Sequence, residues 1–194
     1  MAADLAGLLE ERGIAAAHLV GHSMGGKAAM WLALSRPEQV RSLTVVDIAP
    51  VAYASRFGAL VDALQALPLG ELRDRRDADA HLAAAVASDK VRGYLLQNLA
   101  YDADQGLRWR VNLPVTARSL GDILGFPAAD GREFAGPTLF VYGSRSDYVG
   151  AEGLARIRAL FPLARMRAIP NAGHWVYADQ PDAFLAAIAG FLKD

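Results

Sequence analysis

The sequence predicts an α/β fold built on a mainly parallel sheet of about four strands. Four short apolar runs have the length and composition of buried parallel strands, and they lie at 16–21, 42–47, 138–143 and 164–169. The first, third and fourth runs are each followed by apolar residues at helical spacing. Strands that alternate with helices in this way are typical of a parallel sheet with helical crossovers.

The first half of the predicted core covers residues 1–50. It opens with an acidic amphipathic helix, MAADLAGLLEERG, before the first strand. The segment GGKAAMWLALS after that strand predicts a second helix, which ends at Pro37 because proline cannot continue a helix. The second strand then ends at Asp47.

The second half of the predicted core covers residues 136–194. The third strand is followed by AEGLARIRALF, whose apolar residues have helical spacing and which stops at Pro162. The fourth strand is followed by QPDAFLAAIAGFL, with Pro181 near the first turn and one continuous apolar face. Both segments predict helices.

Residues 51–135 separate the two halves of the core. The gap between the second and third strands is about ninety residues, far more than one crossover helix needs. Three helices are predicted within it, from the apolar spacing of RFGALVDALQ and from the segments DADAHLAAAVA and SDKVRGYLLQNL, the last with Ser88 as N-cap. We interpret 51–135 as a helical cap, or lid, inserted into the core.

Composition excludes several function classes. The net charge is −1, which argues against a nucleic-acid partner, and no apolar run approaches the roughly 18 residues of a membrane span. There is no cysteine, so disulfides, thiolate catalysis and cysteine-ligated zinc are excluded. The N-terminal segment has neither a secretory nor a transit pattern, and we expect a cytoplasmic protein.

The stretch LVGHSMGGKAAM, residues 19–30, matches two motifs at once. It contains G-x-x-x-x-G-K, most of a phosphate-binding P-loop, and the run LTVVD resembles the strand-plus-Asp that supports magnesium in such proteins. The residue after the lysine should carry a hydroxyl for that metal, but it is Ala28. A nucleotide-binding site is therefore the weaker alternative.

The same stretch contains G-x-S-x-G, the motif of a nucleophile turn between a strand and a helix, with Ser23 at its centre. Gly21 and Gly25 are expected to let this tight turn pack against neighbouring backbone. A hydrolase of this kind also needs a late histidine and an acid at a strand end, and His174 follows the fourth strand in IPNAGHW. The sequence offers two acids, Asp47 after the second strand and Asp147 after the third.

The chain resembles the YbfF-type esterases, a branch of the α/β-hydrolase superfamily. The resemblance rests on GHSMGGKAAM, VVDIAP, YLLQNL, WRVNL and NAGHWVYADQPDAF, and it covers essentially the whole sequence, including the cap. It implies a small-molecule ester or acyl-thioester substrate such as an acyl-CoA, and neither a metal nor an organic cofactor.

The resemblance also bears on the acid. In many α/β-hydrolases the acid occupies a slot in the loop after the third strand present here, and in GSRSD that slot holds Ser146, with Asp147 one step further on. In the YbfF-like branch the acid instead comes from the motif that matches VVDIAP, and the serine at the slot assists it. We therefore predict Asp47 as the acid and Ser146 as an assisting residue.

The predicted mechanism is acyl transfer through a covalent acyl-enzyme. Ser23 attacks the acyl carbonyl, His174 acts as base and then as acid, and Asp47 orients the imidazole. The backbone N–H of Met24, at the start of the helix, is the predicted oxyanion donor. Of their neighbours, His22 is expected to shape the turn, and Lys27 to be a solvated or ion-paired charge.

The N-terminal part of the fold is expected to be incomplete. In the complete α/β-hydrolase fold several strands precede the nucleophile, whereas only 22 residues precede Ser23. We therefore expect the second oxyanion donor to be lacking and the apolar first strand to form an exposed edge. The alternative function is a catalytically impaired fragment that acts only as a binding or dimerising module, for example as a homodimer.

Overall fold

The computed structural model describes residues 1–54, 57–104, 106–129 and 131–193. The chain divides into two compact units, the first made of Met1–Ala52 with Gly125–Asp194 and the second of Tyr53–Leu124. The second unit is shorter than the predicted 51–135 because the described residues after Leu124 pack with the first unit. The N–H of Phe134, for example, donates to the carbonyl of Leu160 over 2.8 Å.

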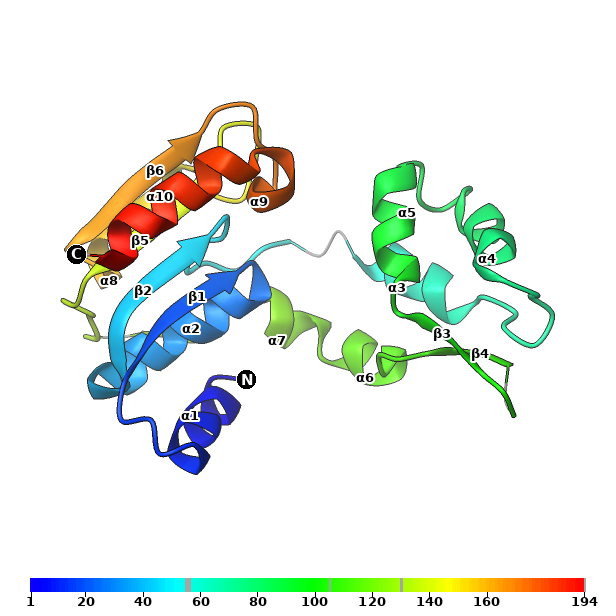
Figure 1. Ribbon diagram of the computed structural model, residues 1–194, viewed down its shortest axis with the longest axis horizontal. Helices are drawn as coiled ribbons and strands as arrows, with labels where there is room; N and C mark the ends of the chain where they lie inside the picture. Colours follow the sequence, from blue (N-terminus) through cyan, green and yellow to red (C-terminus); the bar gives the residue numbers. More distant parts are fainter. Residues whose placement is uncertain (55–56, 105, 130, 194) are drawn as a thin grey trace. The chain divides into compact units, whose positions relative to one another are not determined.

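The first unit contains a parallel sheet of four strands in the order β1-β2-β5-β6 (Figure 1). Each strand lies where an apolar run predicted it, so the predicted fold class is confirmed. Strand β1 is at one edge of this sheet and pairs with β2, and Val20 on β1 is 51% exposed. The strands are β1 (Ala17–His22), β2 (Val40–Val46), β5 (Thr138–Gly143) and β6 (Ala164–Ile169).

Helices cover both faces of this sheet. On one face, Val46 of β2 belongs to an apolar cluster that includes Phe184 of α10. On the other face, Val45 of β2 lies close to Gly26 of α2, as expected for side chains that alternate along a strand. The helical elements of this unit are α1 (Ala2–Glu11), α2 (Met24–Ser35), the short 3₁₀ helix Pro37–Gln39, α8 (Ala151–Leu160), α9 (Val176–Asp179) and α10 (Pro181–Lys193).

The second unit has helices where three were predicted, and Ser88 caps α5 by accepting a hydrogen bond from the N–H of Val91. It also has an unpredicted antiparallel hairpin, β3–β4, in which Leu99 faces Trp109. The hairpin packs its apolar side chains into the same core as the helices. The elements are α3 (Gly58–Gln65), α4 (Arg75–Leu82), α5 (Asp89–Leu96), β3 (Leu99–Asp102), β4 (Gly106–Trp109), α6 (Leu113–Arg118) and α7 (Leu120–Leu124).

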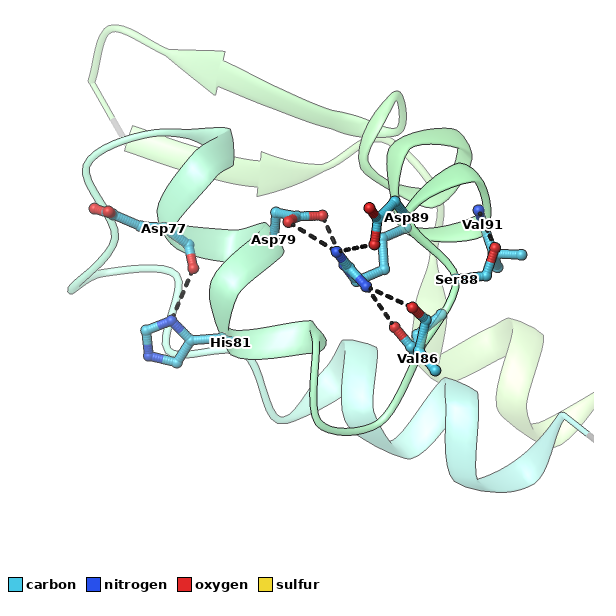
Figure 2. A network of polar contacts seen from close by, with 9 residues as sticks. Asp77, Asp79, His81, Val86, Ser88, Asp89 and Val91 are labelled. Atoms are coloured by element: carbon cyan, nitrogen blue, oxygen red, sulfur yellow. Dashed lines mark hydrogen bonds and ion pairs between the residues drawn. The ribbon is translucent and has the colours of Figure 1, made fainter.

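A buried arginine ties α4 to α5 in this second unit. The guanidinium of Arg92 donates to the carboxylates of Asp79 and Asp89 and to the carbonyls of Val86 and Ala87. Figure 2 shows Asp79, Asp89 and Val86 in this network of polar contacts. The cation therefore supplies donors to the carbonyls of the turn between the two helices, which an apolar side chain would leave without these partners. None of the helices in the described residues is both long enough and apolar enough to cross a membrane.

Candidate active site

The carboxyl ends of the parallel strands bring the predicted site residues together. Ser23 follows β1, and its N–H donates to the carbonyl of Val46 over 3.0 Å. Asp47 follows β2, and its N–H donates to the carbonyl of Val141 over 2.8 Å. Each residue thus extends the hydrogen-bond ladder by one step. Parallel strands end at the same edge of the sheet, which is where α/β proteins collect functional side chains.

The turn at Ser23 is strained. Its φ is 51°, in the left-handed region that non-glycine residues rarely adopt, and helix α2 starts directly after it. A Cβ at Gly21 would lie 2.5 Å from the carbonyl oxygen of Gly25, and one at Gly26 would lie 2.7 Å from a methyl of Ile48. Glycine is therefore required at both positions so that the strand and the helix can meet at this turn.

Gly25 does not have the packing role that was predicted for it. A Cβ built there meets nothing within 4 Å, so close packing does not require glycine at this position. The expectation that both motif glycines permit close approach is wrong for Gly25. Gly26, which the sequence analysis did not single out, makes the close contact instead.

Ser23, His174 and Asp47 form a continuous chain of hydrogen bonds. Nδ1 of His174 lies 2.8 Å from Oδ2 of Asp47, and Nε2 lies 3.1 Å from Oγ of Ser23. The Asp47 side chain is fully buried, whereas that of His174 is 23% exposed. An ionised Asp47 can only accept, so the pairing assigns the proton to Nδ1 and leaves Nε2 as the acceptor for the serine hydroxyl.

The Asp47 carboxylate has two further donors. The N–H of Gly143 donates to Oδ1 over 3.0 Å, and the hydroxyl of Ser146 donates to Oδ2. Ser146 therefore lies where the sequence analysis expected an assisting residue. The sequence offered Asp47 and Asp147 as candidates for the acid. The carboxylate that is hydrogen-bonded to His174 is that of Asp47, and Asp147 follows Ser146 in the loop after β5.

Met24 is the first residue of α2, and the first N–H groups of a helix have no acceptor within the helix. Its backbone N–H, which belongs to the residue directly after Ser23, can therefore stabilise negative charge that develops on a bound carbonyl oxygen. The arrangement can support nucleophilic attack with proton transfer. In the described residues no cluster of three or more His, Cys, Asp or Glu side chains is arranged to hold a metal ion.

His22 reaches beyond the turn that it was expected to shape. Its Nε2–H donates to the carbonyl of His174 over 2.9 Å, and the two ring centroids are 4.6 Å apart. Burial is the main cause that lowers the pKa of His22 below its ordinary value, which favours the neutral form near pH 7. His22 thus links the nucleophile turn to the histidine loop without adding a positive charge.

Lys27 was expected to be a solvated or an ion-paired charge, and the first of these alternatives does not hold. It is only 7% exposed, its Nζ donates to the carbonyl of Gly125 over 2.8 Å, and burial lowers its pKa to about 8. The first turn of a helix is an unfavourable place for a cation, because the N-terminal end of the helix dipole is positive. The expectation of a solvated side chain is therefore wrong.

Tyr148 is part of the site although no sequence motif points to it. Its ring stacks on the imidazole of His174, with the centroids 4.1 Å apart and the planes 25° from parallel. The only sequence signal is its position, two residues after Ser146 in the loop that follows β5. Nothing in that spacing predicts which ring it contacts.

The sequence pattern of the alpha/beta hydrolase fold matches residues 1–181. The chain belongs to the alpha/beta hydrolase family. It is 43% identical to the sn-1-specific diacylglycerol lipase ABHD11 of Mus musculus, over 99% of this chain and 64% of that protein. It is 36% identical to Esterase YbfF of Escherichia coli strain K12, over 100% of this chain and 74% of that protein, so the resemblance to that branch is confirmed.

A solved structure supports the same assignment. The alpha/beta hydrolase chain superimposes on a structure described as "Marine microorganism esterase" with a TM-score of 0.93 and 30% sequence identity, over 98% of this chain and 75% of that one. The chain spans between 62% and 64% of the length of the ABHD11 relatives from mouse, zebrafish and two Xenopus species.

Proposed function

We propose that this chain is a serine hydrolase that cleaves carboxylic esters or acyl-thioesters. The observation that carries the proposal is the hydrogen-bonded path from the Ser23 hydroxyl through His174 to Asp47. Similarity to proteins named as a lipase and as esterases supports the same reaction class. The small-molecule substrate is thus an acyl group joined to an alcohol or a thiol.

In the proposed reaction, Oγ of Ser23 bonds to the acyl carbon while Nε2 of His174 takes the hydroxyl proton. The carbonyl oxygen becomes an oxyanion, which the N–H of Met24 stabilises. The bond to the leaving group then breaks, and His174 returns the proton to the departing alcohol or thiol. Water repeats these steps on the acyl-enzyme and releases the acid.

We further propose that the second unit, inserted between β2 and β5, is the cap that selects the substrate. Two observations support this proposal, namely the position of the second unit in the chain and the apolar core that this unit has of its own. A homodimer or another non-catalytic binding role is the second candidate function. The exposed edge strand β1 favours it, because such edges pair readily with other chains.

Hydrolysis of nitrophenyl esters and acyl-CoAs of graded length by the wild type and by Ser23→Ala tests the proposal. We expect the substitution to lower kcat/KM at least about 10³-fold, because it removes the nucleophile. The matched control is Ser35→Ala, since Ser35 lies at the far end of the same helix and its hydroxyl donates to the carbonyl of Trp31. Turnover that survives in Ser23→Ala, or wild-type protein with no turnover, contradicts the proposal and leaves the binding role.

A further inference from the structure

The loop after β5 contacts the Ser-His-Asp chain in two ways. The hydroxyl of Ser146 donates to the Asp47 carboxylate, and two residues later the ring of Tyr148 stacks on the imidazole of His174. The same loop is tied internally, because the N–H of Tyr148 donates to Oγ of Ser146 over 3.3 Å. The backbone of Tyr148 thus supports the acid, while its side chain contacts the base.

The stacked ring of Tyr148 restrains the tilt of the His174 imidazole, which its hydrogen bonds restrain only weakly. Hydrogen bonds to Asp47 and Ser23 act in the plane of the His174 ring and at its edge, and they leave rotation of the plane about that axis weakly restrained. A phenol ring packed nearly parallel on the face opposes such tilting. The phenol ring also presents an electron-rich face, which attracts the positively charged imidazolium more strongly than the neutral imidazole.

We propose that Tyr148 is a positioning residue that holds the imidazole plane of His174 between Ser23 and Asp47 and stabilises its protonated form. This inference rests on the proposed hydrolase function, in which His174 becomes positively charged when it takes the serine proton. The benefit therefore arises mainly in the transition state, and removal of the ring should lower kcat more than it changes KM.

The other titratable groups around His174 belong to other residues and are common to all the Tyr148 variants. Asp47 at the end of β2 bonds to Nδ1, and His22 at the end of β1 donates to the His174 carbonyl. Asp179 of α9 accepts a hydrogen bond from the N–H of Gly173, and Tyr177 of the same helix forms a T-shaped pair with the His22 ring. A change in titration after substitution at Tyr148 therefore reports on the stacked ring itself.

The test compares Tyr148→Phe, which keeps the aromatic face, with Tyr148→Leu, which removes it. The readouts are kcat and KM on a nitrophenyl ester, the acid limb of the kcat/KM pH profile, and the titration midpoint of the His174 imidazole by NMR. His174→Gln identifies the imidazole signal. The matched control is Tyr101→Leu, because Tyr101 lies on β3 in the second unit and is 73% exposed.

We expect Tyr148→Phe and Tyr101→Leu to behave like the wild type. In Tyr148→Leu, kcat should fall about 3- to 10-fold, and the acid limb and the NMR midpoint should both move down by about 0.5 to 1 pH unit. A midpoint that stays or rises overturns the proposal. A rise is what mere shielding predicts, since water admitted to a partly buried imidazole favours the charged form.

The NMR titration needs no turnover, so it separates this inference from the proposed function. A wild type without Ser23-dependent hydrolysis contradicts the function, while the midpoint in Tyr148→Leu still decides whether the ring stabilises the charged imidazole. Circular dichroism checks the fold of each variant. If Tyr148→Leu does not fold, Tyr148→Gln provides the same loss of the aromatic face and is judged by the same criteria.

Discussion

Asp47 is held more tightly than a surface carboxylate could be. Its side chain is fully buried and accepts from Gly143, Ser146 and His174, so both of its oxygens are fixed in direction. A carboxylate held in this way fixes the orientation of the imidazole and the nitrogen that carries its proton. This is the physical reason to assign the acid role to Asp47.

We expect Asp47→Asn to lower kcat about 10³- to 10⁴-fold with little change in KM, because an amide neither fixes the tautomer nor stabilises the imidazolium. Asp147→Asn is the matched control and should keep kcat within about threefold of the wild type, a range within which a surface charge change normally falls. Steady-state kinetics on a nitrophenyl ester measures both variants. An active Asp47→Asn together with an inactive Asp147→Asn would reverse the assignment.

The buried amine of Lys27 should make the free energy of unfolding depend on pH. Its pKa is about 8 in the folded protein and 10.5 in its ordinary state, so the unfolded chain binds more protons between these values. Below pH 8 both states carry the charge, and burial destabilises the folded one. Stability relative to Lys27→Met should therefore rise from pH 8 to 10.5, by up to about 3 kcal/mol.

Urea unfolding of the wild type and Lys27→Met across that pH range gives the difference in the free energy of unfolding. Lys90→Met, at an exposed lysine of α5, is the control and should show no such trend. A Lys27 difference that is flat with pH would mean that the amine binds protons equally in the folded and unfolded states over this range. The stability of the fold would then not be linked to the titration of Lys27.

At the scale of elements, the strand–turn–helix around Ser23 depends on very close backbone contact. The turn residue has a φ of 51°, and the strand before it and the helix after it approach at Gly21 and Gly26. The two motif glycines differ, because a Cβ at Gly21 would meet the carbonyl of Gly25, whereas one at Gly25 would meet open space. This contrast gives a matched pair of substitutions within one motif.

We expect Gly21→Ala to lower the free energy of unfolding by about 1 to 3 kcal/mol, because a backbone atom in a packed turn cannot move aside cheaply. Gly25→Ala should leave stability unchanged or raise it slightly, since alanine favours a helix more than glycine does. Chemical denaturation of both variants measures this contrast. Equal effects at the two positions would show that packing at Gly21 does not limit the turn.

At the scale of the whole described chain, strand β1 lies at an edge of the sheet and bears on association. Strand β1 pairs with β2 on one side, and its apolar residue Val20 is half exposed. A lysine on an edge strand opposes pairing with another chain, because its charge would have to be buried. The edge thus provides a direct test of the dimer hypothesis.

We expect the wild type to self-associate with rising concentration, and Val20→Lys to move that association to about tenfold higher concentration. Sedimentation velocity measures the effect. Val115→Lys, at a valine of α6 that is 43% exposed, controls for the added charge. A wild type that stays monomeric, or a Val115→Lys variant with the same shift as Val20→Lys, would remove β1 as the associating surface.

Local sequence patterns were enough to predict the four strands of the parallel sheet and most of the helices. They also singled out Ser23 and His174. A nucleophile turn is defined by the strand, serine and helix around it, and buried strands are recognisable as apolar runs. The hairpin β3–β4 was not predictable in this way, because two four-residue strands gain stability only from the core on which they pack.

The tertiary structure decided which distant residues meet. Parallel strands β2 and β5 lie side by side, and this places Ser146 on the Asp47 carboxylate and Tyr148 on the His174 ring, although about a hundred residues separate Asp47 from that loop. The burial of Lys27 likewise depends on where the chain returns at Gly125. Local patterns determined Ser23 and His174 as the candidate nucleophile and base, whereas the groups that contact them come together only through the order of the strands.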